Sequence, residues 1–154
     1  EVHSFGPVIL TKAVPPHMIG QGGGHLLCPS SIVGVFGFPL RSAYSAAKHA
    51  MHVFFESVRA EYYASNIKVS IIIGGRINTP ISVNALMPDG SAYGLMDEGQ
   101  KGGISPEKAA RQILKGIRKG RPEIKTGGKE LLMVTLKRRF PRLHFRIARR
   151  VKPT

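Results

Sequence analysis

The stretch that decides the fold is residues 25–73, HLLCPSSIVGVFGFPLRSAYSAAKHAMHVFFESVRAEYYASNIKVSIII. It opens with HLLCPSSIV, a short apolar run of the length of a buried strand. A long helix is then predicted over about 43–64, with Ser42 as its N-cap. Asn66 ends this helix, and IKVSIII follows as a second buried strand rich in β-branched residues. A strand, a helix and a second strand in this order predict a right-handed crossover and a parallel sheet.

The flanking segments continue the alternation of helices and strands. Residues 7–19 carry apolar residues at helical spacing, and the prolines at 15–16 are expected to end or kink that helix. Downstream, Ser-Pro-Glu at 105–107 is a helix-start signature for a helix to about Lys119, and 123–126 is a short third strand. We therefore predict an α/β fold with about three parallel strands, helices on both faces and one long unprotected sheet edge.

The basic residues are concentrated toward the C-terminus. The 154-residue chain has a formal net charge of +14, yet residues 1–100 hold six basic and six acidic residues. Residues 101–154 hold 17 basic and three acidic ones, so the excess belongs to a tail added to a neutral body. We predict two parts, a body at 1–129 and a basic amphipathic tail at 130–154. No nucleic-acid-binding motif accompanies the charge, and nucleic acid is not predicted as a partner.

Two interpretations of the tail stay open. ELLMVTLKRRFPRLHFRIARRV at 130–151 interleaves Leu, Met, Phe and Ile with Arg and Lys, and Pro141 interrupts it. Such a segment binds anionic membrane surfaces. The alternative is a C-terminal helix that packs its apolar side on the domain or on a sister subunit.

The remaining composition predicts a cytoplasmic protein, with peripheral membrane attachment through the tail as a further option. No stretch approaches the ~18 consecutive apolar residues of a membrane-spanning helix. Residues 1–10 lack a basic start and read as a chain entered in its middle rather than as a signal peptide. The single cysteine, Cys28, fits a reducing compartment and is expected to be a buried, inert thiol.

Three residues in the deciding stretch form a candidate reaction centre. Tyr44 and Lys48 are four residues apart on the predicted helix, so the Lys48 ammonium is expected beside the Tyr44 phenol. A neighbouring cation favours the phenolate, and a tyrosine activated in this way can act as an acid or base. Ser31 stands 13 residues before Tyr44 at a strand end, where it can donate a hydrogen bond to a substrate oxygen.

In this context the sequence from Phe5 to Thr79 resembles the short-chain dehydrogenase/reductase (SDR) family, and in particular its member 7-like branch. FGPVILTKAVPPHMI resembles the helix that leads away from the central sheet of that family, and GGGHLLCPSSIVG its catalytic-serine strand. SAYSAAKHAMHVFFESVRAE is similar to its active-site helix, and KVSIIIGGRINT to the next strand and cofactor loop. DEGQKGGISPEKAARQILKGI and GGKELLMV resemble the family more loosely, so the likeness covers about 130 of the 154 residues.

The resemblance implies the C-terminal part of a doubly wound, Rossmann-like sheet and an oxidoreductase that uses NADP or NAD. The substrate would be an apolar small molecule whose secondary alcohol and carbonyl forms are interconverted. Tyr44 would be the proton donor and acceptor, and Lys48 would bind the nicotinamide ribose and lower the pKa of Tyr44. Ser31 would polarise the carbonyl, with Ser30 as the alternative.

The resemblance also assigns the loop after the second strand. Gly75, Ile77 and Thr79 would line the nicotinamide carboxamide and the diphosphate, together with Tyr44 and Lys48 at the ribose. The segment 80–104 would be the substrate lid, and the full-length form would be a homo-oligomer.

Several positions depart from the family pattern. The Gly-rich dinucleotide loop is absent, and GQGGGH at 20–25 is no substitute because it precedes a strand instead of following one. His3 stands where the family commonly has an Asn behind the Lys. Gly74 replaces a usual Pro, and Pro29 lies in a strand that would need its N–H. The alternative to an enzyme is therefore a truncated, non-catalytic module that binds a membrane surface or a partner through its tail.

The other histidines show no metal-ligand spacing, and no metal is predicted. We expect surface or capping roles for them: His17, His25, His49, His52 and His144. The long helix is expected to present one apolar or small face, made of Ala46, Ala50, Val53, Phe54, Ser57 and Val58. Core packing is expected for Met51, Val53, Phe54 and Phe55.

Overall fold

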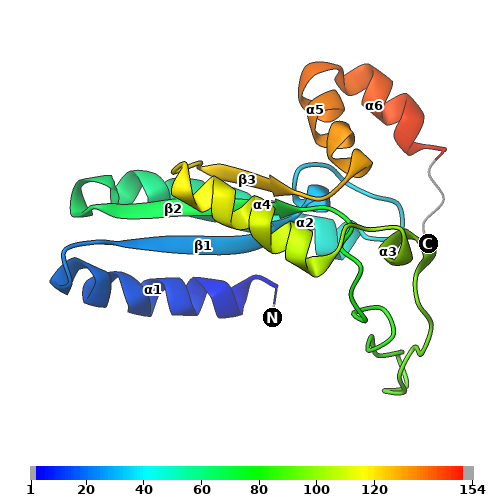
Figure 1. Cartoon of the computed structure of the whole chain (residues 1–154), viewed down its shortest axis with the longest axis horizontal. Helices are drawn as coiled ribbons and strands as arrows, with labels where there is room; N and C mark the ends of the chain where they lie inside the picture. The colour runs from blue at the N-terminus through cyan, green and yellow to red at the C-terminus, as the bar shows by residue number, and fades with distance from the viewer. Residues whose placement is uncertain (1–2, 151–154) are drawn as a thin grey trace.

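The computed structural model describes residues 3–150 and shows a parallel sheet of three strands in the order β1–β2–β3, with helices on both faces (Figure 1). The strands are β1 (Gly24–Ser31), β2 (Ile67–Gly74) and β3 (Glu123–Thr126). The helices are α1 (Phe5–Gly20), α2 (Ser42–Glu61), α3 (Glu98–Lys101), α4 (Pro106–Arg118), α5 (Leu132–Arg139) and α6 (Pro141–Ala148). The α/β class and the predicted order of strands and helices are confirmed.

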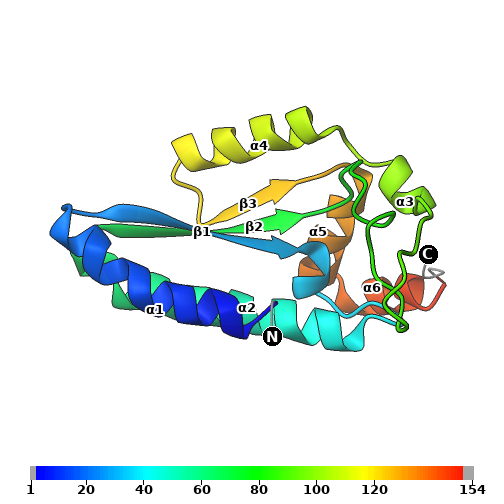
Figure 2. The same ribbon diagram turned by 90° about the horizontal axis from the view of Figure 1, so that it is seen from below.

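The central strand β2 forms the middle of the core. Helices α1 and α2 cover one face of the sheet and α4 covers the other (Figure 2). Ile71 and Ile73 of β2 are fully buried, and Ile124 of β3 is 1% exposed. Gly116 lets α4 approach β3 closely, because a Cβ there would lie 2.6 Å from Cγ2 of Ile124. In the described sheet β1 has a neighbour on one side only, and Leu27 in it is 39% exposed.

The strand register brings three chain segments together at the carboxyl edge of the sheet. Ser31 at the end of β1 pairs with Gly74 at the end of β2, and Gly74 pairs with Thr126 at the end of β3. The next N–H, that of Gly75, donates to the Thr126 carbonyl at 2.7 Å. Ligands of open α/β sheets bind at this edge.

Two details of the helices differ from the sequence expectations. Helix α1 runs through Pro15 and Pro16 to Gly20, although each proline removes one N–H from the helix. Pro15 is fully buried, so its packing offsets part of the lost hydrogen bonding. Ser42 is the first residue of α2 and not its N-cap; Arg41 holds the cap position and makes no side-chain cap hydrogen bond.

Met51 and Phe55 of α2 are buried and Phe54 packs against the core, as predicted, but Val53 is not part of it. The buried residues of this helix are Ser45, Met51, His52, Phe55 and Val58. Val53 is 55% exposed, so its expected place in the core is wrong. The helix carries small or apolar residues on two sides, and periodicity does not indicate which of them packs on the strands.

The tail forms two short helices at the end of the molecule near the carboxyl edge of the sheet (Figure 1). The predicted break at Pro141 is confirmed, since this proline is the first residue of α6. Val134 is fully buried, and the Arg138 guanidinium forms a salt bridge of 2.5 Å with Glu123 of β3. The last predicted tail residues, 151–154, lie outside the described residues. Across residues 3–150 no helix has both the length and the apolar character needed to cross a membrane.

Candidate active site

Ser31 is positioned by the end of β1 and the turn that follows it. The strand stops at this residue, and Ile32–Gly34 continue as a single 3₁₀ turn. The Ser31 hydroxyl accepts a hydrogen bond from the Val33 N–H at 3.4 Å, which caps the turn. The backbone thus presents this hydroxyl at the carboxyl edge of the sheet.

Helix α2 brings Tyr44 and Lys48 to the same place. Tyr44 lies close enough to Ser31 for the serine hydroxyl to lower the pKa of the phenol, and the Lys48 ammonium lies 5.8 Å from the centroid of the Tyr44 ring. Lys48 also donates a hydrogen bond of 3.2 Å to the carbonyl of Pro29 in β1. Ser31, Tyr44 and Lys48 form the candidate reaction centre. The helical spacing predicted the proximity of Tyr44 and Lys48, and the resemblance to the family predicted Ser31 beside them.

The electrostatics of Tyr44 differ from the expectation. Burial raises the pKa of the phenol, and this outweighs the lowering by the Ser31 hydroxyl and by the Arg41 charge. The predicted lowering of this pKa by Lys48 is not found, because the Lys48 ammonium lies beside the ring and bonds to Pro29. Tyr44 is consequently a protonated phenol at neutral pH.

His3 contacts Tyr44 directly. The two rings meet edge to face, with centroids 5.1 Å apart and an angle of 83° between their planes. The residue that stands in place of the family's Asn is thus close to the reaction centre. It contacts the Tyr44 ring and takes no part in the hydrogen bond between Lys48 and Pro29.

The loop after β2 is held by two distant segments. Ile77 forms an isolated parallel bridge with Ile104, in which the Ile104 N–H donates to Arg76 at 3.1 Å. Gly75 packs on the Glu130 side chain so closely that a Cβ would lie 2.1 Å from Oε1 of Glu130. Glycine at 75 therefore leaves room for the Glu130 side chain, and the loop that carries Ile77 and Thr79 has a defined path.

Glu130 anchors this loop and was not identified from the sequence. Its Oε1 accepts hydrogen bonds from the Arg76 N–H at 2.6 Å and from the Gly128 N–H at 2.9 Å. Burial raises the pKa of Glu130, but these two backbone donors, its own backbone N–H and the Arg76 charge together outweigh it and hold the pKa below its usual value. Arg76 and Glu130 are 54 residues apart, so no local pattern indicates the contact.

Two histidines of α2 hold the segment around Ser31. His52 is 5% exposed, and its Nε2 forms a hydrogen bond of 2.7 Å with the Ser30 hydroxyl. One turn earlier, His49 donates from Nδ1 to the Gly34 carbonyl at 2.7 Å. The surface or capping role predicted for His52 is wrong; the available signal was its position one turn after Lys48 on the same helix.

The glycine run at 22–24 takes no part in this site. It connects α1 to β1 at the amino end of the strand, opposite to the end that carries Ser31 (Figure 1). There the Asn66 amide donates to the Gly22 carbonyl at 2.9 Å. Its role is a turn between a helix and a strand.

The Cys28 thiol is 4% exposed, and burial raises its pKa to about 11. It therefore stays protonated, which agrees with the expected inert thiol. Among residues 3–150, no three His, Cys, Asp or Glu side chains are arranged to hold a metal ion.

Comparison with known proteins gives a consistent result. Residues 1–88 match the family model described as short chain dehydrogenase. A Drosophila melanogaster protein named Dehydrogenase/reductase SDR family protein 7-like is 48% identical over 123 residues, covering 80% of this chain and 38% of that protein. Dehydrogenase/reductase SDR family member 7B of Danio rerio is 38% identical over 148 residues, covering 96% of this chain and 48% of that protein. The chain thus spans less than half the length of these two relatives.

Solved structures share the fold. A short-chain dehydrogenase from Streptomyces avermitilis superposes with a TM-score of 0.74 at 27% identity, covering 96% of this chain and 58% of that chain. A short chain dehydrogenase from Burkholderia cenocepacia, solved in complex with NADP, gives a TM-score of 0.76 at 23% identity over 99% of this chain and 57% of that one.

Proposed function

This chain belongs to the short-chain dehydrogenase family, and from that premise we propose that it carries the catalytic half of an oxidoreductase that uses NADP or NAD. The proposed reaction interconverts a secondary alcohol and a ketone or aldehyde on an apolar small molecule, and the proposal concerns the full-length protein. The observation that carries it is the convergence of Ser31, Tyr44 and Lys48 at the carboxyl edge of the sheet, with the Lys48 ammonium 5.8 Å from the centroid of the Tyr44 ring.

The protonation state of Tyr44 suits proton donation. Because burial keeps the phenol protonated at neutral pH, Tyr44 can give its proton to a carbonyl oxygen during reduction and take it back in the reverse direction. Ser31, which lies close to Tyr44, can hold the same substrate oxygen. Ser30 is less suited, since its hydroxyl is bonded to His52. The dinucleotide, when bound, supplies or accepts the hydride.

Lys48 has donors to spare for a ribose. An ammonium carries three N–H donors, and one of them is used by the Pro29 carbonyl. The others can bind ribose hydroxyls.

The residues of this chain fit one end of the cofactor. A Cβ at position 75 would collide with Glu130. Because Gly75 has none, the loop to Ile77 and Thr79 can lie against the ends of the strands. These residues, together with Tyr44 and Lys48, would hold the nicotinamide and its ribose. The chain offers no glycine loop between a strand and a following helix for the diphosphate, since the glycines at 22–24 precede β1.

The segment 80–104 is proposed as the substrate lid. It contains only the short helix α3 and a bridge between Leu86 and Ala92, and it joins the cofactor loop through Ile104. Ile81 is 62% exposed and Leu95 is 63% exposed, so apolar side chains are available to cover an apolar substrate.

Assembly and location are further parts of the proposal. Ile9 and Leu10 of α1 and Val53 of α2 are 67%, 66% and 55% exposed, which supports a homo-oligomer of the full-length form through this side. A cytoplasmic protein attached peripherally to membranes by its tail agrees with the unpaired Cys28 and the basic C-terminus. The alternative of a non-catalytic module gains no support from the comparisons.

Substitution of the reaction centre in the full-length protein tests the proposed activity. Tyr44→Phe removes the proton donor and almost no volume, so kcat should fall by about 10²–10⁴-fold with little change in cofactor affinity. Lys48→Ala should lower both kcat and cofactor affinity, because it removes the ribose contact as well as the charge. Steady-state kinetics and a fluorescence titration with NADPH measure the two effects. Near-normal turnover by Tyr44→Phe would show that the tyrosine is not the proton donor.

A further inference from the structure

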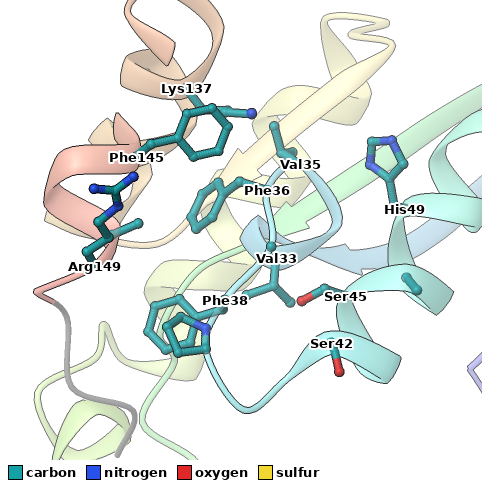
Figure 3. A pocket seen from close by; sticks show the side chains of 14 residues that line it. Val33, Val35, Phe36, Phe38, Ser42, Ser45, His49, Lys137, Phe145 and Arg149 are labelled. Carbon is teal, nitrogen blue, oxygen red and sulfur yellow. The ribbon is translucent and has the colours of Figure 1, made fainter. Parts of the chain in front are cut away.

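A groove separates the C-terminal helices from the start of α2 (Figure 3). Its volume is about 760 Å³, within the range of sites that take small molecules, and the loop 33–39 forms its floor. The side chains that line it include Ser45 and His49 of α2 and Lys137, Phe145 and Arg149 of the tail. None of the three candidate reaction-centre residues lines it.

The floor and one wall of the groove are aromatic. Phe36 and Phe38 come from the loop, and Phe145 comes from α6. Phe36 is 6% exposed and meets the buried His144 ring edge to face, with centroids 4.8 Å apart. This contact attaches α6 to the loop and keeps the groove formed. Apolar walls of this kind accept an alkyl chain.

The charged side chains that line the groove are both cationic. Lys137 and Arg149 stand on the tail side, and no acidic side chain lines the groove. The Lys137 ammonium lies 4.1 Å from the centroid of the Phe145 ring. Within residues 3–150 neither cation takes part in a salt bridge. An anionic group bound at the rim of this apolar surface would therefore interact with two cations that no described carboxylate neutralises.

A buried hydroxyl adds a polar contact inside the groove. Ser45 is 6% exposed, and its Oγ has no hydrogen-bond partner among the described residues. It lies on the α2 wall, with its oxygen turned toward the loop residues (Figure 3). Buried hydroxyls are normally hydrogen-bonded, so this one leaves a free donor and acceptor on the α2 wall of the groove.

We propose that this groove binds a single-chain anionic amphiphile, with its head between Lys137 and Arg149 and its alkyl chain along Phe36, Phe38 and Phe145. The head is a carboxylate or a phosphate, which share the chemistry that two cations recognise. The ligand would rest on the loop that follows Ser31, outside the reaction centre. The site therefore lies beyond the proposed oxidoreductase function.

Calorimetric titration of the intact chain tests the site with three probes below their micelle concentrations: dodecanoate, dodecyl phosphate and dodecanol. We expect saturable binding of one molecule of an anionic probe, and at least tenfold weaker binding of dodecanol. The tighter of the two anions identifies the head group. No saturable binding of either anion, or equal binding of dodecanol, would overturn the proposal.

Two double variants of equal charge separate the groove from the basic surface in general. Lys137→Gln with Arg149→Gln removes the cations that line the groove and should weaken binding at least tenfold. Arg142→Gln with Arg146→Gln removes two exposed cations of α6 outside the groove and should leave affinity within twofold. Circular dichroism checks that both variants fold. An equal loss of affinity in the two variants would show binding by charge alone and refute the groove.

Amide chemical shifts of the unmodified chain provide evidence that needs no variant. On addition of dodecanoate, shifts confined to residues 33–39, 42–49 and 137–149 support the site. Shifts centred on α1 or on β1 would place the probe elsewhere and contradict it.

Discussion

His49 and His52 place Ser31 relative to Tyr44 by holding the residues on either side of the serine. His52 bonds to Ser30, and His49 bonds to the Gly34 carbonyl. A Cβ at Gly34 would lie 2.8 Å from Nε2 of His52, so only glycine leaves room for the contact. Since both histidines and Tyr44 belong to α2, the helix carries the tyrosine and also clamps the serine segment.

His144 has a different role, because it is buried without a hydrogen bond. The residue is 1% exposed, and neither ring nitrogen has a partner among the described residues. The predicted surface or capping role is therefore wrong for His144. Its ring meets Phe36 and Phe145 edge to face and so packs as an aromatic side chain. Burial, with the nearby Lys137 charge, lowers its pKa from 6.5.

This burial predicts a stability that depends on pH. The unfolded chain binds a proton at His144 more readily than the folded chain does. The contribution of His144 to the free energy of unfolding is therefore fully present above pH 6.5 and is lost as the pH falls below it. His144→Leu removes two unpaired buried nitrogens and should raise the free energy of unfolding by ~1 kcal/mol at pH 7.5. Urea unfolding at pH 7.5 and pH 5.5 checks both effects.

The variant should also lose less stability than the parent chain between these two pH values. Some loss will remain, because burial lowers the pKa of His25 and His52 as well. An unchanged pH dependence in His144→Leu would show that His144 does not contribute to it.

Helices α5 and α6 each have one side on the body and another side exposed. Val134 and His144 are buried, and Arg138 pairs with Glu123. Leu132, Phe140 and Leu143 are 70%, 60% and 46% exposed. Exposed apolar residues next to arginines are typical of segments that bind anionic membrane surfaces. Both interpretations of the tail therefore keep a physical basis.

Vesicle co-sedimentation at several salt concentrations tests the membrane interpretation. Each basic residue near an anionic surface contributes ~1 kcal/mol. The Debye length falls from ~30 Å at 0.01 M to ~8 Å at 0.15 M salt. Binding to vesicles with anionic lipid should therefore weaken as salt rises and nearly vanish with neutral lipid.

A truncation and a variant complete this test. The chain 1–129 should not pellet with the vesicles, and its loss of Val134 and His144 from the core should also lower its stability. Arg142→Gln with Arg146→Gln keeps the core and should weaken vesicle binding alone. If neither the intact chain nor the truncation pelleted, or both pelleted equally, the membrane interpretation would be wrong.

The sheet as a whole is open at β1. Within the described residues this strand pairs with β2 only, whereas β2 lies between two partners. Pro29 is tolerated there because an edge strand need not donate from every N–H. The chain also spans less than half the length of the two relatives compared above. The proposed nicotinamide-binding residues lie in this chain, and the glycines at 22–24 precede β1 instead of joining a strand to a following helix.

We therefore predict weak cofactor binding by the 154-residue chain alone. The adenosine and diphosphate contribute most of the contacts in a dinucleotide site, and they normally rest on a glycine loop and the following helix. Calorimetric titration with NADPH should show no saturation at micromolar concentrations. Micromolar affinity would instead mean that this chain forms a complete site.

The local rules that act within a few residues determined much of this protein from its sequence. The cap Ser105 is confirmed, its Oγ accepting from the Lys108 N–H at 3.3 Å, and β3 covers the predicted 123–126. The spacing of Tyr44 and Lys48 predicted their proximity, because residues four apart lie on one side of a helix, and the resemblance to the family placed Ser31 with them. These features depend on periodicity, capping and turn chemistry, which are set by residues close together in the sequence.

Only the tertiary structure decided the contacts between distant segments and the burial that follows from them. Glu130 reaches Arg76 across 54 residues and His52 reaches Ser30 across 22, and neither pair has a local signal. The pKa of Tyr44 rises because surrounding chain segments exclude water from it. Burial and long-range hydrogen bonding depend on how separate elements pack, so spacing along the chain cannot predict them.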